Sequence, residues 1–280
     1  MARYKDLKSR TVTAIPLIGG FAALLIGAAY STWGTILMAV VGIVALLIAA
    51  YEYTDFSTRE LEKRDVLVSR LLRFLMLTVA PLLVVGGFIA NHTLPLGLSI
   101  TIAVLTFGCG LFLAGRTELF FVRDYVQTTS VALIHVGICG AFLVSLPLVP
   151  EGASRLLVLV AVVAANDIAA YFGGSRLKGP KFAPALSPNK TISGSICGFI
   201  AGALVIVGLH YIIRPTTSLV WDIVLGLVVV FAAQLGDLSK SYLKRIHGVK
   251  DTGAILPGHG GILDRIDGIL AGAPFLFFWW

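Results

Sequence analysis

Acidic and basic side chains are concentrated in one stretch of an otherwise apolar chain, residues 236–268, which reads GDLSKSYLKRIHGVKDTGAILPGHGGILDRIDG. Its acids are Asp237, Asp251, Asp264 and Asp267, and its bases include Lys244, Arg245, Lys250, His259 and Arg265. Acids interleaved with bases are typical of a site that binds a metal ion together with phosphate groups. The alternative interpretation is a solvated loop between two membrane helices.

Three of these acids lie at the ends of apolar runs. Asp237 follows the run LVVVFAAQLG, and Asp264 and Asp267 lead into the last apolar run of the chain. An ionised carboxylate at that depth is costly unless it is paired or bound to a cation. Asp264 and Asp267 are three residues apart and therefore share a helix face. Several carboxylates near one point predict a Mg²⁺ site, because Mg²⁺ prefers oxygen ligands.

Two further patterns favour phosphate binding. Asp237, Ser241 and Lys244 recur at i, i+4 and i+7, so one helical face would carry a metal ligand, a hydroxyl and an ammonium group. The glycine-rich turn at 257–261 precedes the last helix. Its glycines allow backbone N–H groups to approach an anion, and the helix N-terminus adds its positive end.

A second polar region spans residues 166–194. Asp167 lies near the end of an apolar run, and an acid within a membrane segment indicates a functional site by default. The loop adds Arg176, Lys178, Lys181, Lys190, Ser187, Thr191 and Gly194. Lysines and backbone amides of this loop could hold phosphate or a lipid headgroup. The alternatives are a helix-packing role for Asp167 and an ordinary basic cytoplasmic loop.

Residues 241–267 resemble the signature of phosphatidate cytidylyltransferases, also called CDP-diacylglycerol synthases. The matching positions are Ser241, Leu243, Lys244, Arg245, Lys250, Asp251, Gly253, Leu256, Pro257, His259, Gly260, Gly261, Asp264, Arg265 and Asp267. Asp167, Tyr171, Gly174 and the run 187–191 are similar to the second conserved region of that family, whereas residues 1–150 resemble it only in hydropathy. The chain departs from the family at Lys240, where an acid is usual, at Gly268, often Ser, and at Ser193.

The resemblance implies an enzyme that transfers CMP from CTP to phosphatidic acid, producing CDP-diacylglycerol and pyrophosphate. A lipid phosphate oxygen would attack the α-phosphorus of CTP. This nucleophile is already an anion, so positioning and charge neutralisation are needed and a strong general base is not.

Roles for individual residues follow from the same resemblance. We expect Asp237, Asp264 and Asp267 to hold Mg²⁺; the presence of a second cation, Mg²⁺ or K⁺, is left open. Lys244, Arg245 and Lys250 would neutralise the negative charge of the triphosphate. Ser241 and Arg265 would also bind the nucleotide. Phosphate oxygens would contact Gly260 and Gly261, while His259 either binds phosphate or stabilises the turn. Asp251 would orient Lys250 or Arg265, or ligate metal. Asp167, Lys190 and Thr191 would shape the lipid-phosphate or nucleotide side.

Composition then defines the elements that must position these residues. The chain has 280 residues, 57% of them hydrophobic and 13% charged, with a mean hydropathy of +0.91. No water-soluble core could hide this much apolar surface, so lipid is part of the solvent. We predict an all-α, polytopic transmembrane helical bundle with about nine spans. The expected spans are 12–30, 33–51, 71–90, 94–114, 128–149, 154–173, 193–213, 218–236 and 266–280.

Charge placement predicts the orientation of this bundle. With the N-terminus in the cytoplasm and the C-terminus outside, Arg155 and Arg214 are the only exceptions among 22 Lys and Arg to the positive-inside rule. The active site then faces the cytoplasm from the cell inner (plasma) membrane. Residues 1–150 would provide scaffold and dimer or lipid contacts (spans one to five), and residues 151–280 the catalytic region (spans six to nine). Cleavage of the first span after 27–29 is an alternative that leaves the later topology unchanged.

The expected partners are CTP, phosphatidic acid and the lipid bilayer. The net charge of +7 is explained by topology and anionic ligands, so no nucleic acid is expected. The resemblance implies a homodimer, with helix seams near Gly198 and Gly202. Isolated cysteines make a zinc or iron–sulfur site unexpected. Rival functions are the same chemistry on another lipid phosphate, as in CDP-archaeol synthases, and a cation-coupled transporter using Asp167 and Asp237.

Overall fold

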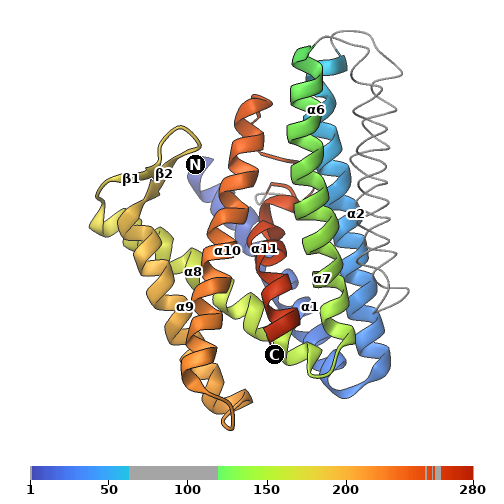
Figure 1. Ribbon diagram of the computed structural model, residues 1–280, viewed down its shortest axis with the longest axis vertical. Helices are drawn as coiled ribbons and strands as arrows, with labels where there is room; N and C mark the ends of the chain where they lie inside the picture. Colours follow the sequence, from blue (N-terminus) through green and yellow to red (C-terminus); the bar gives the residue numbers. More distant parts are fainter. Residues whose placement is uncertain (1, 63–118, 250, 254, 256–259, 280) are drawn as a thin grey trace.

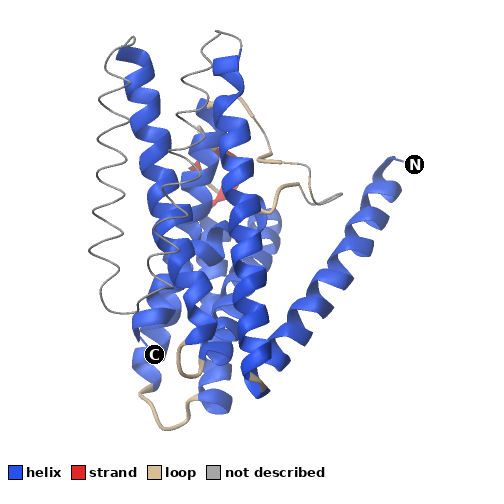
Figure 2. Cartoon of the chain, turned by 90° about the vertical axis from the view of Figure 1, so that its right-hand side faces the viewer, coloured by secondary structure: helices blue, strands red, loops and turns tan. Residues whose placement is uncertain are grey.

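The computed structural model describes residues 2–62, 119–249, 251–253, 255 and 260–279, and this part of the chain is mostly helical. Its α-helices are α1 (Ala2–Tyr30), α2 (Thr32–Glu62), α6 (Leu119–Ala132), α7 (Gly140–Ser145), α8 (Gly152–Leu177), α9 (Ile192–Ile213), α10 (Leu219–Ile246) and α11 (Leu263–Trp279). The long helices lie side by side (Figure 1), and Figure 2 shows α1 inclined to the rest. Helices suit a lipid environment because they satisfy their own backbone hydrogen bonds.

Five of the described helical segments are long and apolar enough to cross a membrane. They are Thr32–Ser57, Val126–Leu148, Gly152–Leu177, Ile192–Ile213 and Leu219–Ile246, with a shorter apolar helix at Pro16–Tyr30. The expected spans at 33–51, 128–149, 154–173, 193–213 and 218–236 each overlap one of these segments. The expected spans at 71–90 and 94–114 lie outside the described residues, so the total of nine stays a prediction. The last expected span corresponds to α11, whose 17 residues fall short of the roughly 20 needed for a full crossing.

One membrane-length segment changes helix type along its length. α6 continues into a π-helix, η2 (Leu133–Cys139), then into α7 and a 3₁₀ turn, η3 (Leu146–Leu148). π-turns widen a helix locally and are frequent at functional sites. This one carries His135, whose position is described below.

A short antiparallel hairpin corrects the purely helical prediction. β1 (Lys181–Ala183) pairs with β2 (Ser187–Thr191), with Lys181 opposite Thr191 and Ala183 opposite Ser187. The chain then enters α9 at Thr191, whose hydroxyl accepts a hydrogen bond from the N–H of Gly194 at 3.1 Å. Thr191 therefore acts as an N-cap. The hairpin and the end of α10 lie at the same end of the bundle, and the C-terminus lies toward the other (Figure 1).

Small residues of α9 bring the C-terminal helices together. A Cβ added to Gly198 would lie 2.2 Å from Oδ1 of Asn166 on α8, and one added to Gly202 would lie 2.3 Å from a methyl group of Val230 on α10. These glycines were expected to serve a dimer seam. They instead form contacts within the chain, because helices approach closely where no side chain intervenes.

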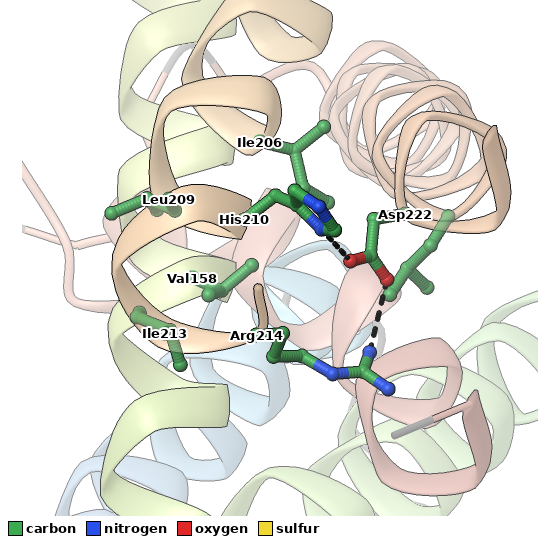
Figure 3. A pocket seen from close by; sticks show the side chains of 8 residues that line it. Val158, Ile206, Leu209, His210, Ile213, Arg214 and Asp222 are labelled. Carbon is green, nitrogen blue, oxygen red and sulfur yellow. Dashed lines mark hydrogen bonds and ion pairs between the residues drawn. The ribbon is translucent and has the colours of Figure 1, made fainter. Parts of the chain in front are cut away.

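A buried ionic cluster closes the turn between α9 and α10, at the end of the bundle away from the hairpin (Figure 3). Asp222 accepts hydrogen bonds from Nη1 of Arg214 at 3.0 Å and from the hydroxyl of Thr217 at 2.9 Å, and Nδ1 of His210 lies 2.8 Å from its Oδ2. His210, Arg214 and Asp222 line an otherwise apolar pocket. Because the carboxylate is already bonded to side chains of its own turn, the cluster stabilises the turn.

Removing the Asp222 carboxylate should destabilise the protein. Asp222→Ala removes a buried carboxylate that is paired with Arg214 and bonded to His210 and Thr217, and breaking a buried ion pair costs about 3–5 kcal/mol. We expect a clearly lower midpoint of thermal unfolding in detergent. Thr217→Val is the matched control, because it removes a hydrogen bond of about 1.5–3 kcal/mol to the carboxylate but leaves both charges in place, and it should lower the midpoint less. Equal midpoints for Asp222→Ala and the unmodified protein would contradict a structural role for the cluster.

Candidate active site

Three predicted metal ligands meet at one lysine. Nζ of Lys240 lies 3.4 Å from Oδ1 of Asp237, 3.3 Å from Oδ1 of Asp264 and 2.5 Å from Oδ2 of Asp267. It also donates a hydrogen bond to the backbone carbonyl of Asp264 at 3.2 Å. Asp237 and Lys240 lie on α10, and the other two acids lie on α11, which packs beside α10 (Figure 1). The charged faces of α10 and α11, which are separated by a loop in the sequence, thus meet at one point.

Two outer lysines complete this cluster. Lys190, on β2, forms an ion pair with Oδ2 of Asp237. Lys244, one turn beyond Lys240 on α10, donates to Oδ1 of Asp264 at 2.9 Å. Among the described ion pairs, Asp267 contacts no lysine besides Lys240. Three carboxylates and three ammonium groups balance one another, so the cluster is neutral when all are ionised.

The loop that precedes α11 adds hydrogen bonds to Asp264. Oδ2 of Asp264 accepts from the backbone N–H of Thr252 at 2.9 Å and from the Thr252 hydroxyl at 3.0 Å. Burial opposes ionisation of this carboxyl, but the ammonium of Lys240, the Thr252 N–H and Lys244 together outweigh it and lower its pKa to about 2. Asp264 is therefore ionised at neutral pH and available to a cation.

A buried acid from the N-terminal half of the chain holds the start of α11. Glu52, on α2, is 1% exposed, and its carboxylate accepts from the N–H groups of Ile262 at 3.0 Å and Leu263 at 2.9 Å. A Cβ added to Gly253 or Gly261 would lie 2.6 or 2.5 Å from a Glu52 oxygen. A carboxylate here satisfies otherwise unpaired amides and complements the helix dipole. Glu52 thereby sets the position from which Asp264 and Asp267 project.

This contact changes the interpretation of the glycine-rich turn. The amides at the start of α11 were expected to face a phosphate, but two of them donate to Glu52. Gly260 has a φ of +80°, which favours glycine, and a Cβ there would lie 3.4 Å from Oδ2 of Asp264. The turn therefore packs tightly around the carboxylates, and the role of Gly260 and Gly261 in binding phosphate stays a prediction.

His135 contacts the backbone of α11 beside the cluster. Its Nε2 lies 2.9 Å from the backbone carbonyl of Asp267, and the imidazole is 7% exposed. The π-turn η2 places this ring against α11. No role was expected for His135 from the sequence, because histidines scattered through apolar runs carry no local pattern.

The second polar region forms a wall beside the cluster. Asp167 accepts from Nδ2 of Asn166 at 2.9 Å, and Oδ1 of Asn166 accepts from Gln234 at 2.8 Å. Gln234 lies one turn before Asp237 on α10, and its Oε1 accepts from the hydroxyl of Ser195 on α9 at 2.5 Å. This network links α8 and α9 to α10, and Lys190 on β2 pairs directly with Asp237. The role of Asp167, Lys190 and Thr191 in substrate binding stays a prediction.

Other predicted residues lie at the edge of the cluster or beyond it. Arg245 is exposed, and its Nε donates to the carbonyl of Leu186 in the hairpin at 3.1 Å. Thr191 is buried as the cap of α9. Asp251 and Arg265 are exposed and Ser241 is half-buried. Lys250 and His259 lie outside the described residues.

Sequence reasoning missed Glu52, Lys240 and His135 as members of this site. Glu52 had a usable signal, because it is an acid at the end of an apolar run. Lys240 was noted only as a departure from a family pattern. The sequence feature that could have identified Lys240 is its position three residues after Asp237, which places its ammonium one turn away on the same helix.

The donor set fits a hard cation. Oδ2 of Asp267 is buried, and its described partner is the ammonium of Lys240 at 2.5 Å. Carboxylate oxygens that converge on one point are suitable ligands for Mg²⁺. Within the described residues, however, no three His, Cys, Asp or Glu side chains are already arranged around a vacant metal position. The ammonium of Lys240 is at the point that the carboxylates face.

The fold and the site together define a multi-pass membrane enzyme whose charged cluster suits phosphoryl chemistry. The chain belongs to the cytidylyltransferase family, whose model matches residues 8–280. It is similar to phosphatidate cytidylyltransferase of Brucella suis biovar 1, with 36% identity over 97% of this chain and 92% of the relative. The Bacillus subtilis phosphatidate cytidylyltransferase is 35% identical over 56% of this chain and 59% of the relative. The Helicobacter pylori (strain 26695) protein of the same name is 43% identical over 44% and 45%.

Substitution of Glu52 tests its control over α11. Glu52→Gln keeps the size of the side chain but removes its charge and turns one acceptor into a donor facing an N–H group. We expect activity to fall about 10- to 100-fold, the usual effect of losing a group that orients metal ligands. The Mg²⁺ concentration for half-maximal rate should rise. Glu151→Gln, at the start of α8, is the matched control and should change neither quantity. An unchanged Mg²⁺ requirement in folded Glu52→Gln would show that Glu52 does not position the ligands.

Proposed function

We propose that the chain transfers CMP from CTP to phosphatidic acid, producing CDP-diacylglycerol and pyrophosphate for phospholipid synthesis. The observation that carries this proposal is the convergence of Asp237, Asp264 and Asp267 with three lysines at one end of a membrane bundle. Family membership and full-length similarity to phosphatidate cytidylyltransferases support it.

The reaction needs little proton chemistry from the protein. A phosphate oxygen of phosphatidic acid forms a bond to the α-phosphorus of CTP, and the bond from that phosphorus to the β-phosphate oxygen breaks. The electron pair leaves with pyrophosphate. Because the nucleophile is an anion and the leaving group is highly charged, the protein must bring like charges together and neutralise them.

Charged residues of the cluster would perform this neutralisation. Asp237, Asp264 and Asp267 would hold Mg²⁺, which when bound supplies positive charge to the triphosphate and the departing pyrophosphate. Lys244, which contacts only Asp264 among the described ion pairs, is placed to turn toward a phosphate oxygen. Arg245 lies one residue further along α10, near the hairpin. Lys250, His259 and Arg265 are proposed for the nucleotide on sequence grounds alone.

The wall formed by Asp167, Lys190 and Thr191 would bind the lipid-phosphate side. Lys190 pairs with Asp237, so its ammonium lies between the hairpin and the carboxylates. Thr191 fixes the turn from β2 into α9 and would act by positioning Lys190. A lipid headgroup entering between these elements would meet positive charge first, in agreement with an anionic substrate.

We also propose that the enzyme lies in the plasma membrane with this site facing the cytoplasm. The described parts of the expected inside segments, at the end of α2, in the hairpin and at the end of α10, lie toward one end of the bundle (Figure 1). The N-terminus inside, the C-terminus outside and a homodimer complete the proposal. The glycines of α9 are used within the chain, so a dimer contact would use another surface.

The two rival functions differ in what supports them. An archaeol-type lipid phosphate would react through the same phosphate group, and the charged cluster does not distinguish the two kinds of lipid tail. A cation-coupled transporter would need Asp167 and Asp237 along a path across the membrane. Asp167 is instead hydrogen-bonded to Asn166, and Asp237 is paired with Lys190; such fixed contacts favour a site over a path.

Loss of one carboxylate tests the proposed reaction. Purified protein incubated with labelled CTP, phosphatidic acid and Mg²⁺ should form CDP-diacylglycerol. Asp264→Asn and Asp267→Asn should each lower the rate at least about 100-fold, since charge stabilisation at the reacting phosphorus is the largest catalytic contribution. Asp251→Asn, an exposed acid of the same segment, should lose less. Absence of a CDP-lipid from the unmodified protein with phosphatidic acid and with an archaeol-type phosphate would refute the function.

A reporter fused after Trp280 tests the topology. An odd number of spans with the N-terminus inside places the C-terminus outside. A reporter active only outside the cytoplasm should therefore be active, and one active only inside should be silent. The opposite pattern would contradict nine spans.

A further inference from the structure

Lys240 is surrounded as a bound cation would be. Its ammonium lies within 3.4 Å of carboxylate oxygens from Asp237, Asp264 and Asp267 and donates to the carbonyl of Asp264, and its side chain is 6% exposed. A lysine that only stabilises a helix pair needs one partner. This one contacts every predicted metal ligand.

The other charges explain why the lysine is retained there. Asp237 and Asp264 have further partners in Lys190 and Lys244, whereas Asp267 has only Lys240 among the described ion pairs. An unpaired carboxylate at this depth is costly, so the ammonium neutralises a charge that a metal ion would otherwise neutralise. It is attached to the chain and is present at any metal concentration.

We propose that Lys240 is a built-in monovalent cation of the catalytic site, which takes the place of a second metal ion so that the enzyme works with a single Mg²⁺. This inference rests on the proposed function, because it assumes that the three carboxylates bind Mg²⁺. Once Mg²⁺ is bound, the ammonium stays in the cluster and keeps its contacts with the carboxylate oxygens that the metal does not occupy.

Local charge explains why one metal ion would be enough. The three carboxylates and three lysines sum to zero, so a single Mg²⁺ already gives the cluster a positive charge with which to receive a triphosphate. An acid in place of Lys240 would exchange a positive charge for a negative one. That difference equals the charge of one divalent cation, and such a site has reason to bind one more metal ion.

Metal counting on the full-length protein in detergent tests the inference directly. Mn²⁺, used as the probe, is measured by electron paramagnetic resonance with the unmodified protein, Lys240→Gln and Lys240→Glu. We expect one bound Mn²⁺ in the unmodified protein and two in Lys240→Glu. Lys244→Ala is the matched control, because it removes a lysine that contacts a single carboxylate, and its count should stay at one.

Chemical rescue provides a second readout. Lys240→Ala should lose about 100-fold in activity, the size expected when one charge at the reacting centre is removed. Potassium, ammonium or methylammonium chloride should restore at least about tenfold, whereas choline chloride at the same ionic strength should not, since choline is too large for the space. Lys244→Ala should show no such rescue. The unmodified protein should be equally active in potassium and choline salts.

The outcomes separate the two hypotheses. No Mn²⁺ bound to the unmodified protein, or no loss of Mn²⁺ in Asp267→Asn, contradicts the metal site and hence the proposed mechanism. Two Mn²⁺ in the unmodified protein, or a requirement for potassium, overturns the role of Lys240 and leaves the reaction intact. A count of one in folded Lys240→Glu with no rescue of Lys240→Ala also overturns it. If the variants do not fold, the count and salt dependence of the unmodified protein still decide.

Discussion

The contact between the Lys240 ammonium and three buried carboxylates is the interaction around which the charged end of this protein is arranged. An apolar bundle cannot hold ionised groups unless they neutralise one another. Three acids from two helices therefore require positive charge at their meeting point, and Lys240 supplies it from within one of those helices. Lys190 and Lys244 then neutralise the outer carboxylates, and this attaches the hairpin and the last turns of α10 to the same point.

The position of α11 depends on a second buried charge. Glu52 comes from α2, far from α11 in sequence, and binds the first amides of that helix. His135 contacts the backbone of the same helix one turn later, from a π-turn. The N-terminal half of the chain is therefore more than a scaffold. Through these contacts it sets the position of the acids that are proposed to bind Mg²⁺, and catalysis by positioning requires that this position be accurate.

The chemistry follows from this balance of charge. In the proposed reaction, the neutral cluster would attract a triphosphate once Mg²⁺ is bound, and its lysines would exchange carboxylate for phosphate without entering an apolar region. At the other end of α9 and α10, the carboxylate of Asp222 is bonded on all sides by groups of its own turn. The first cluster combines three carboxylates and three lysines from α10, α11 and β2, whereas the described groups of the second surround the one carboxylate of Asp222.

Much of this site was predictable from the sequence, because membrane spans and family signatures are local patterns. Hydropathy located the described spans, and spacing placed Asp264 and Asp267 on one helix face and linked the 166–194 region to the carboxylates. The hairpin was not predicted, because its strands are short and polar. The contacts of Glu52, Lys240 and His135 join residues up to 211 positions apart, and no local pattern records such pairings. The sequence by itself determined the class of protein and predicted the acids that are proposed to carry its chemistry. Only the tertiary structure decided which base lies among them and which acid holds their helix, since both depend on where separate helices meet.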